Sequence, residues 1–223
     1  MHQRKSKKIL IYFFLLIALG SINNTSINNL KFENIQNFNV SGLKNINKQN
    51  LILDLKNLDL GNIFFIKKNK INDVLDSNSL VQSFQIFKKY PSTLEINIKE
   101  TKFLAKINKN GQTFIIGSNG KLSTNNFSST ELPYIFGKPD IKDFLKFKKI
   151  VDASKLSYEK IKYLYFYEVN RWDIEFENNV MLKLPKNLSV KSLNDIFVFL
   201  NDEKFKKIKI IDARINNQII VND

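Results

Sequence analysis

Two neighbouring segments alternate apolar and polar residues, and this alternation constrains the fold more than any other feature of the chain. In Thr93–Lys99 (TLEINIK) the apolar residues stand at every second position. Successive side chains of a β-strand point to opposite faces, so this segment predicts a strand with one buried face. Val81–Phe87 alternates in the same way and predicts a second strand, which Tyr90-Pro91 separates from the first.

Residues 30–102 as a whole predict a compact α+β unit with the order strand, helix, helix, strand, strand. Asn37–Leu43 (NFNVSGL) predicts a short strand that ends in a Ser-Gly turn. Asn47 is a suitable N-cap for a first helix, whose apolar positions recur at helical spacing, at Leu51, Leu55 and Leu58. Gly61 interrupts that pattern, and a second helix is indicated by Ile71, Val74 and Leu75.

Residues 103–223 predict a strand-rich β-domain with flanking helices. Short strands are expected at Gly111–Ile116, before a Ser118-Asn119-Gly120 turn, and on either side of Asn178-Asn179, at Trp172–Phe176 and Val180–Leu184. Leu132–Gly137 is an extended piece that Pro133 makes a poor central strand. Amphipathic helices are expected at Ser154–Tyr167 and Val190–Leu200. The terminal segments predict a β-hairpin of Lys206–Ile215 and Gln218–Val221 around Asn216-Asn217.

The N-terminus has the pattern of a segment inserted in a membrane. Residues 1–8 carry four cations, and residues 9–22 are almost wholly apolar. The positive-inside rule places residues 1–8 in the cytoplasm as a short tail, with the body of the chain on the far side. As a helix, residues 9–22 span about 21 Å, which is short against a hydrocarbon core of roughly 30 Å. Ala18-Leu19-Gly20 also suits a signal-peptidase cut, so a retained transmembrane helix and a cleaved segment both stay open.

Composition excludes several classes of enzyme. The 223 residues contain no Cys, and the single His is His2, so the body has no thiolate nucleophile, disulfide, thiolate metal site or His general base. A carboxylate pair or a Ser-Lys dyad remains, and no motif marks either. The net charge of +14 could indicate nucleic acid. Because the cations are nearly all Lys and spread along the chain, we interpret them as a solvated basic surface.

Several local patterns have a functional and a structural interpretation. Asp173, Glu175 and Glu177 share one strand face and could hold Ca²⁺, but a solvated strand face is favoured. Gly117–Gly120 is better explained as a hairpin turn than as a phosphate loop. Trp172 is expected in the core. The aromatic run Tyr163–Tyr167 is expected to form core and rim packing rather than a nucleic-acid stacking face.

Taken together, these segments resemble the FtsQ/DivIB family of bacterial cell-division proteins. Val40-Ser41-Gly42-Leu43 is similar to the opening strand of its POTRA domain, and Leu80–Glu100 followed by Ala105 is similar to its most recognisable stretch. Further pieces recur in the order of its β-domain: Gly120-Lys121-Leu122, Leu132-Pro133, Phe136-Gly137, Trp172-Asp173-Ile174, Leu182–Pro185 and Ile211–Arg214. The sequence departs from the family in its short cytoplasmic tail and in Ala213, where a larger apolar residue is usual.

The resemblance implies a single-pass protein of the bacterial inner membrane, with a periplasmic body and no catalytic activity or cofactor, that acts in the divisome during septum formation. It implies binding to the small division proteins FtsB and FtsL, chiefly by an FtsB strand added at the C-terminal edge of the β-domain. The POTRA domain is associated with other divisome members. The retained helix of the family favours an uncleaved anchor. The alternative is a secreted or periplasmic POTRA-containing accessory for polypeptide assembly or transport.

The expected partner-binding residues lie at the C-terminal edge. Gln218–Val221 carries no charge and no proline, the devices that usually blunt an exposed strand edge, so it suits an incoming strand. Asp212 and Arg214 share a face at spacing two and could contact a partner at the rim, or form only a local ion pair. The predicted site is therefore Asp212, Arg214, Ile215, Gln218, Ile219, Ile220 and Val221. The alternative is that Ile219 and Val221 complete the core and another element covers this edge.

Overall fold

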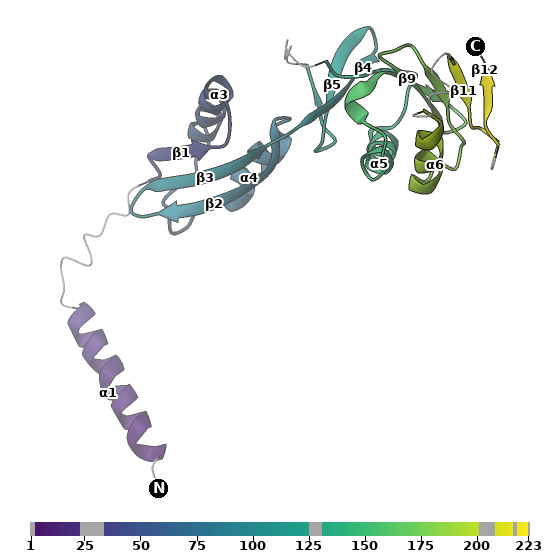
Figure 1. Ribbon diagram of the computed structural model, residues 1–223. Helices are drawn as coiled ribbons and strands as arrows, with labels where there is room; N and C mark the ends of the chain where they lie inside the picture. Colours follow the sequence, from purple (N-terminus) through teal and green to yellow (C-terminus); the bar gives the residue numbers. More distant parts are fainter. Residues whose placement is uncertain (1–2, 23–33, 125–130, 201–207, 216–217, 223) are drawn as a thin grey trace.

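The computed structural model describes residues 3–22, 34–124, 131–200, 208–215 and 218–222. These residues form a helix and two β-sheets, each sheet with helices packed on it (Figure 1), so the predicted α+β class is confirmed. The buried hydrophobic residues fall into two separate clusters. One lies within residues 40–98 and the other within residues 105–213.

The first sheet has three strands and two covering helices. In chain order its elements are β1 (Asn37–Ser41), α3 (Asn45–Lys56), α4 (Lys68–Ser77), β2 (Val81–Lys89) and β3 (Thr93–Glu100). The strand order is β1-β3-β2, with β1 parallel and β2 antiparallel to β3. Leu94, Ile96 and Ile98 of β3 are buried, as their alternation predicts, and they pack with Leu51, Leu55, Ile71 and Leu75 of the helices. The predicted order of strand, helix, helix, strand, strand is confirmed.

The start of α3 differs from the prediction. The N-cap is Lys44, and Asn47 lies inside the helix. Gly42, which follows β1, fixes this position, because it has a φ of +88° and a Cβ there would lie 1.7 Å from the carbonyl oxygen of Ile98. Only glycine fits so close an approach at positive φ, so the chain must turn sharply here, and α3 begins three residues earlier than an N-cap at Asn47 predicts.

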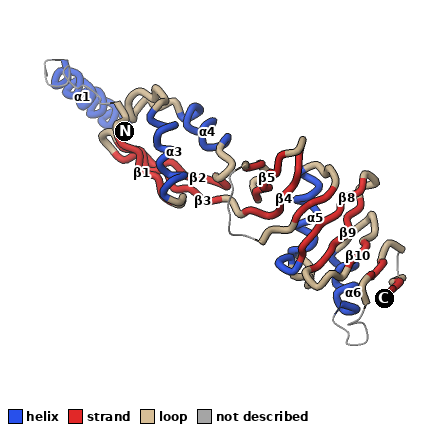
Figure 2. The backbone as a smooth tube through the Cα atoms, turned by 90° about the horizontal axis from the view of Figure 1, so that it is seen from above, coloured by secondary structure: helices blue, strands red, loops and turns tan. Residues whose placement is uncertain are grey.

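The second sheet has nine strands among the described residues. Its strand order is β12-β11-β10-β9-β8-β7-β4-β5-β6. The bounds are β4 (Phe103–Lys109), β5 (Gln112–Gly117), β6 (Leu122–Ser123), β7 (Tyr134–Phe136), β8 (Ile161–Tyr167), β9 (Arg171–Phe176), β10 (Met181–Lys183), β11 (Ile210–Asp212) and β12 (Ile220–Asn222). The helices α5 (Ile141–Asp152) and α6 (Val190–Leu200) lie on the same face of this sheet, and a short 3-10 turn, η1 (Tyr158–Lys160), precedes β8 (Figures 1 and 2).

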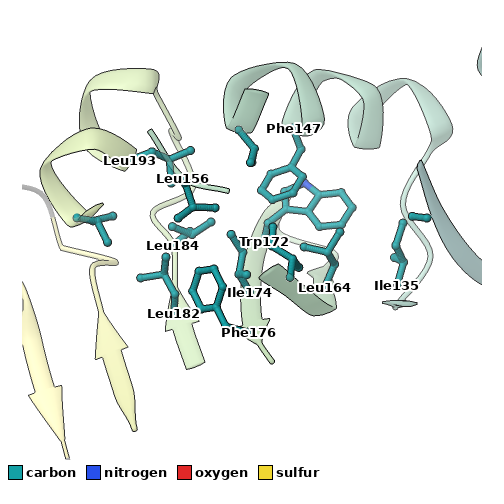
Figure 3. Close-up of a cluster of buried hydrophobic side chains, with 14 of the residues drawn as sticks. Ile135, Phe147, Leu156, Leu164, Trp172, Ile174, Phe176, Leu182, Leu184 and Leu193 are labelled. Atoms are coloured by element: carbon teal, nitrogen blue, oxygen red, sulfur yellow. The ribbon is translucent and has the colours of Figure 1, made fainter. Parts of the chain in front are cut away.

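The core of the second sheet is built around Trp172 (Figure 3). Its ring stacks on Phe147 of α5 with a centroid distance of 4.7 Å and contacts Phe166 at 4.9 Å. Leu193 and Ile196 of α6 belong to the same buried cluster as Leu182 and Leu184. The predictions of a buried Trp172 and of an amphipathic helix at Val190–Leu200 are confirmed.

Two predictions in this region are wrong. Ser154–Tyr167 is not a helix, because after a turn and η1 it forms the central strand β8, and the helix that covers the sheet is α5, which the sequence analysis missed. Leu132–Gly137 is not peripheral either, since β7 lies between β4 and β8 and is parallel to both. Pro133 is compatible with this position because it precedes the first strand residue, where its carbonyl accepts a hydrogen bond from Lys106 N at 2.9 Å.

The C-terminal strands β11 and β12 pair antiparallel, with Asp212 opposite Ile220, as the hairpin prediction requires. The expected turn at Asn216-Asn217 and the expected strand start at Lys206 lie outside the described residues.

Residues Gln3–Ile22 form the helix α1, and the apolar side chains from Ile9 to Leu19 are exposed along it. Among the described residues, no helix combines the length and the apolar character that a membrane crossing needs. The prediction of a transmembrane helix at residues 9–22 is therefore not confirmed.

Candidate functional site: the C-terminal edge of the large sheet

The predicted binding edge is the outermost strand of the nine-stranded sheet. β12 pairs with β11 on one side, and no described strand pairs with its other side. Ile220 and Val221 are 50% and 40% exposed. Ile219 instead packs partly against the core cluster. The expectation that this segment completes the core therefore holds for Ile219, whereas Ile220 and Val221 are exposed at the edge of the sheet.

A carboxylate and a guanidinium lie beside this edge. The guanidinium of Arg214 donates two hydrogen bonds from Nε to Asp212, both at 2.9 Å, and one from Nη2 at 2.6 Å. Hydrogen bonding from Arg214 lowers the pKa of Asp212 below its ordinary value. Asp212 is thereby fixed, while Arg214 and Ile215 remain exposed next to Ile220. The structure therefore brings the predicted residues together around β11 and β12.

A second acidic residue is buried further inside the sheet, on β9, which β10 and β11 separate from the edge strand. Asp173 of β9 is only 1% exposed, although the sequence analysis favoured a solvated strand face. Its carboxylate accepts a hydrogen bond from Leu184 N at 3.2 Å and forms an ion pair with Arg171 at 3.3 Å. Burial raises the pKa of Asp173 despite these partners. Lys183 of β10 lies between the two carboxylates, because it pairs with Asp173 of β9 on one side and with Asp212 of β11 on the other.

The sheet face opposite α5 and α6 carries a row of aromatic rings. Phe136 of β7 stacks on Tyr165 of β8 at 5.1 Å and meets Tyr163 edge-on at 5.5 Å. The Tyr165 hydroxyl donates a hydrogen bond of 2.7 Å to Glu175, and burial together with this bond raises the pKa of Tyr165 to about 12. Phe166 points to the core instead, against Trp172. The expectation of core and rim packing is confirmed, but it did not include Phe136, whose ring contacts both tyrosines.

This arrangement can bind a polypeptide through unpaired backbone groups, exposed apolar side chains and a fixed ion pair. Among the described residues there is no cluster of His, Cys, Asp and Glu that could hold a metal ion. Arg171 and Asp173 of β9 and Lys183 of β10, which lie further inside the sheet, were not among the predicted site residues. The burial of Asp173 could not be predicted from the alternation along β9, because the sequence does not show which side chains cover each face of this strand.

The fold of the first lobe, which is the three-stranded sheet with α3 and α4, defines the class of protein. Its order of strand, helix, helix, strand, strand and its β1-β3-β2 sheet are those of a POTRA domain, and residues 33–101 match the family described as POTRA domain, FtsQ-type. Together with the relatives below, this match shows that the chain is similar to the FtsQ/DivIB family of cell-division proteins.

Relatives with this function in their names align with the chain over different lengths. The cell division protein DivIB of Clostridium botulinum (strain Loch Maree / Type A3) is 28% identical over 89% of this chain and 74% of its own length. The DivIB proteins of Clostridium acetobutylicum and Staphylococcus aureus (strain NCTC 8325 / PS 47) are 35% and 34% identical over 42% and 46% of this chain. The chain spans only 37% and 24% of the length of these last two.

Proposed function

We propose that this protein is a non-enzymatic, membrane-anchored scaffold of the divisome, which binds FtsB-like and FtsL-like proteins on the outer side of the membrane during septum formation. The observation that carries the proposal is the open edge at β12, an exposed strand without charge or proline in the chain's most C-terminal described segment. An incoming strand would gain the main-chain hydrogen bonds that β12 leaves free on that side. The similarity to the FtsQ/DivIB family favours division proteins as the source of that strand.

We propose that α1 attaches the chain to the membrane, with residues 1–8 in the cytoplasm and both sheets outside. The exposed apolar side chains of Ile9–Leu19 have no protein cover among the described residues, and cations stand at the start of the helix. Lys7 and Lys8 can extend along the helix to reach lipid headgroups, and local thinning of the bilayer accommodates a short apolar segment. Other divisome members would contact the POTRA domain.

The edge is tested by measuring binding of the FtsB-like protein of the same organism to the full chain. Ile220→Lys places a charge on the free edge and should weaken binding at least about tenfold, because strand edges with lysine resist pairing. Arg214→Glu should act mainly on the association rate.

Successive strand residues direct their N–H groups to opposite sides. One of Ile220→Pro and Val221→Pro therefore removes a donor to the incoming strand, while the other removes one to β11.

Leu53→Lys is the matched control, because Leu53 is 58% exposed on α3, which packs on the three-stranded sheet and not on the sheet that contains β12. It should leave binding unchanged. Circular dichroism shows whether each variant stays folded. If folded variants at Arg214 and Ile220 bind as tightly as the parent chain, the partner does not use β12.

A further inference from the structure

Two loops of the POTRA domain carry aromatic and cationic side chains on one end of the molecule. The loop before α4 contains Phe64, Phe65 and Lys67, and Lys68 begins the helix. Lys89 ends β2, and Tyr90 follows it in the turn between β2 and β3. We call these six residues the Phe65 patch. Phe65 is 78% exposed, the largest fraction among the exposed large hydrophobic residues of the described chain. Neither loop, at residues 61–68 and 88–93, contains an acidic residue.

The two loops are held together by defined contacts. The rings of Phe64 and Tyr90 lie with centroids 5.0 Å apart. Lys88 Nζ donates a hydrogen bond of 3.4 Å to the carbonyl oxygen of Phe64. Asn62 Oδ1 accepts hydrogen bonds from the backbone N–H groups of Phe64 and Phe65, both at 3.1 Å, which fixes the conformation in which Phe65 is exposed. The Phe65 patch is therefore a defined surface.

Two lysines of the Phe65 patch, Lys67 and Lys68, lie at a helix N-terminus, where a positive charge does not stabilise the fold. Lys67 is the N-cap of α4 and Lys68 its first residue, and the first turn of this helix contains no acidic residue. The N-terminus of a helix carries partial positive charge, so lysines there are unfavourable and carboxylates are preferred. Lys67 also makes no side-chain cap. An external anionic partner would offset this local repulsion.

The chain from α1 enters the POTRA domain between these two loops. Ile35 N donates to the carbonyl oxygen of Gly61 at 3.1 Å, and Gln36 N donates to that of Ser92 at 3.0 Å. The turn between β2 and β3 accordingly lies at the end of the domain from which the chain runs to α1 (Figure 1). Eleven residues, 23–33, join the two parts, and such a length spans at most about 40 Å.

We infer that the Phe65 patch is a second membrane contact, which binds the surface of a bilayer that contains anionic phospholipid. Aromatic rings that insert at the headgroup level, surrounded by lysines, are the chemistry of interfacial membrane binding. The short tether raises the effective concentration of the bilayer at this patch. The patch would fix the orientation of the POTRA domain on the membrane, which goes beyond attachment by α1 and rests on that attachment.

The test uses the full chain in nanodiscs of phosphatidylcholine with or without phosphatidylglycerol. Because the chain has no cysteine, Asn69→Cys on the exposed side of α4 accepts a single fluorescent label. Headgroup-quencher lipids should quench this label at least about twofold more in anionic discs, and high salt should abolish the difference. Lys67, Lys68 and Lys89 changed together to Gln should remove the anionic dependence. Phe65→Ser should reduce quenching in both kinds of disc.

The matched control changes three exposed lysines of the second sheet's lobe, Lys142, Lys186 and Lys191, to Gln, and it should quench like the parent chain. A chain that stays on the discs with an unquenched label overturns the lipid contact but leaves α1 attachment intact. A chain that does not stay on the discs overturns both. A label that is unquenched by lipid but shifts with added polyglutamate would assign the patch to an acidic protein, which also overturns the inference.

Discussion

Two carboxyl groups of the second sheet, Asp212 and Asp173, have pKa values that are shifted in opposite directions. Hydrogen bonds from Arg214 lower the pKa of Asp212, whereas burial raises that of Asp173. Asp212 therefore stabilises the fold above its unfolded pKa, and this contribution is lost as pH falls through its folded value. The sign is reversed for Asp173, whose contribution is present below its unfolded pKa and is lost as pH rises through its folded value.

We expect carboxyl-carbon NMR titration to show Asp212 titrating below, and Asp173 above, the ordinary value near 3.8. The variant Arg214→Gln should move the Asp212 midpoint upward and leave Asp173 the higher of the two. Equal midpoints for the two carboxyl groups in the parent chain would contradict the arrangement at this edge.

The burial of Asp173 shows where residue patterns reach their limit. Alternation along β9 correctly places Trp172 and Ile174 on one face and Asp173 on the other, but it contains no information on what covers each face. In the structure, Trp172, Asp173 and Ile174 are all buried, because α5 covers one face and neighbouring side chains such as Arg171 cover the other. The edge residues Ile220 and Val221 were predictable, since an uncharged terminal segment needs only its own sequence to be recognised.

At the scale of elements, α5 and β8 were assigned wrongly for related reasons. α5 has its buried residues at Phe144, Phe147 and Val151, a helical spacing, but the helix also contains six lysine and acidic residues, which obscure the apolar pattern. β8 has a register shift between Ile161 and Tyr163, so its buried residues Ile161 and Leu164 are three apart and imitate a helix. A β-bulge adds one residue to a strand and shifts its period, which sequence alone did not reveal.

The docking of α5 depends on Phe147, which is buried against Trp172. Phe147→Ala should lower the free energy of unfolding by about 3–5 kcal/mol, because the lost side chain leaves a cavity beside a large ring. Chemical denaturation followed by the fluorescence of Trp172, the only tryptophan, measures this change. Val198→Ala on the exposed side of α6 is the control and should stay within about 0.5 kcal/mol of the parent chain. A loss below about 1 kcal/mol at Phe147 would contradict the packing described.

At the scale of the molecule, the two hydrophobic clusters suggest two folding units. No residue is shared between the cluster around Ile71 and Leu94 and the cluster around Trp172. We propose units at residues 30–102 and 103–223, and we expect a fragment of residues 28–102 to unfold cooperatively on its own. Thermal melting followed by circular dichroism tests this. A fragment that stays unfolded in mild conditions, while the whole chain folds, would show that the second lobe is needed to complete the first.

A polar turn connects the two lobes more tightly than their separate cores suggest. β3 ends at Glu100 and β4 begins at Phe103, so only two residues separate these strands. Beside them, the turn between β5 and β6 contacts the POTRA domain. Asn119 Nδ2 donates hydrogen bonds to the carbonyl oxygens of Ser79 and Val81 at 3.0 and 2.9 Å. Lys121 Nζ donates to those of Asp76 and Asn78, at the C-terminal end of α4, where a cation is favourable.

We expect this turn to hold the lobes in one relative orientation. Spin labels at Asp54→Cys on α3 and Glu168→Cys after β8 are exposed and report the distance between the lobes in the cysteine-free chain. Double electron–electron resonance should give one narrow distance distribution. Asn119→Ala with Lys121→Met should broaden it, because the hydrogen bonds of these two side chains across the boundary are lost while each core is kept. Asn187→Ala with Lys109→Met makes the same chemical changes at exposed sites away from the boundary and should keep the distribution narrow. If the distribution stays equally narrow without the Asn119 and Lys121 side chains, these two side chains do not fix the relative orientation of the lobes.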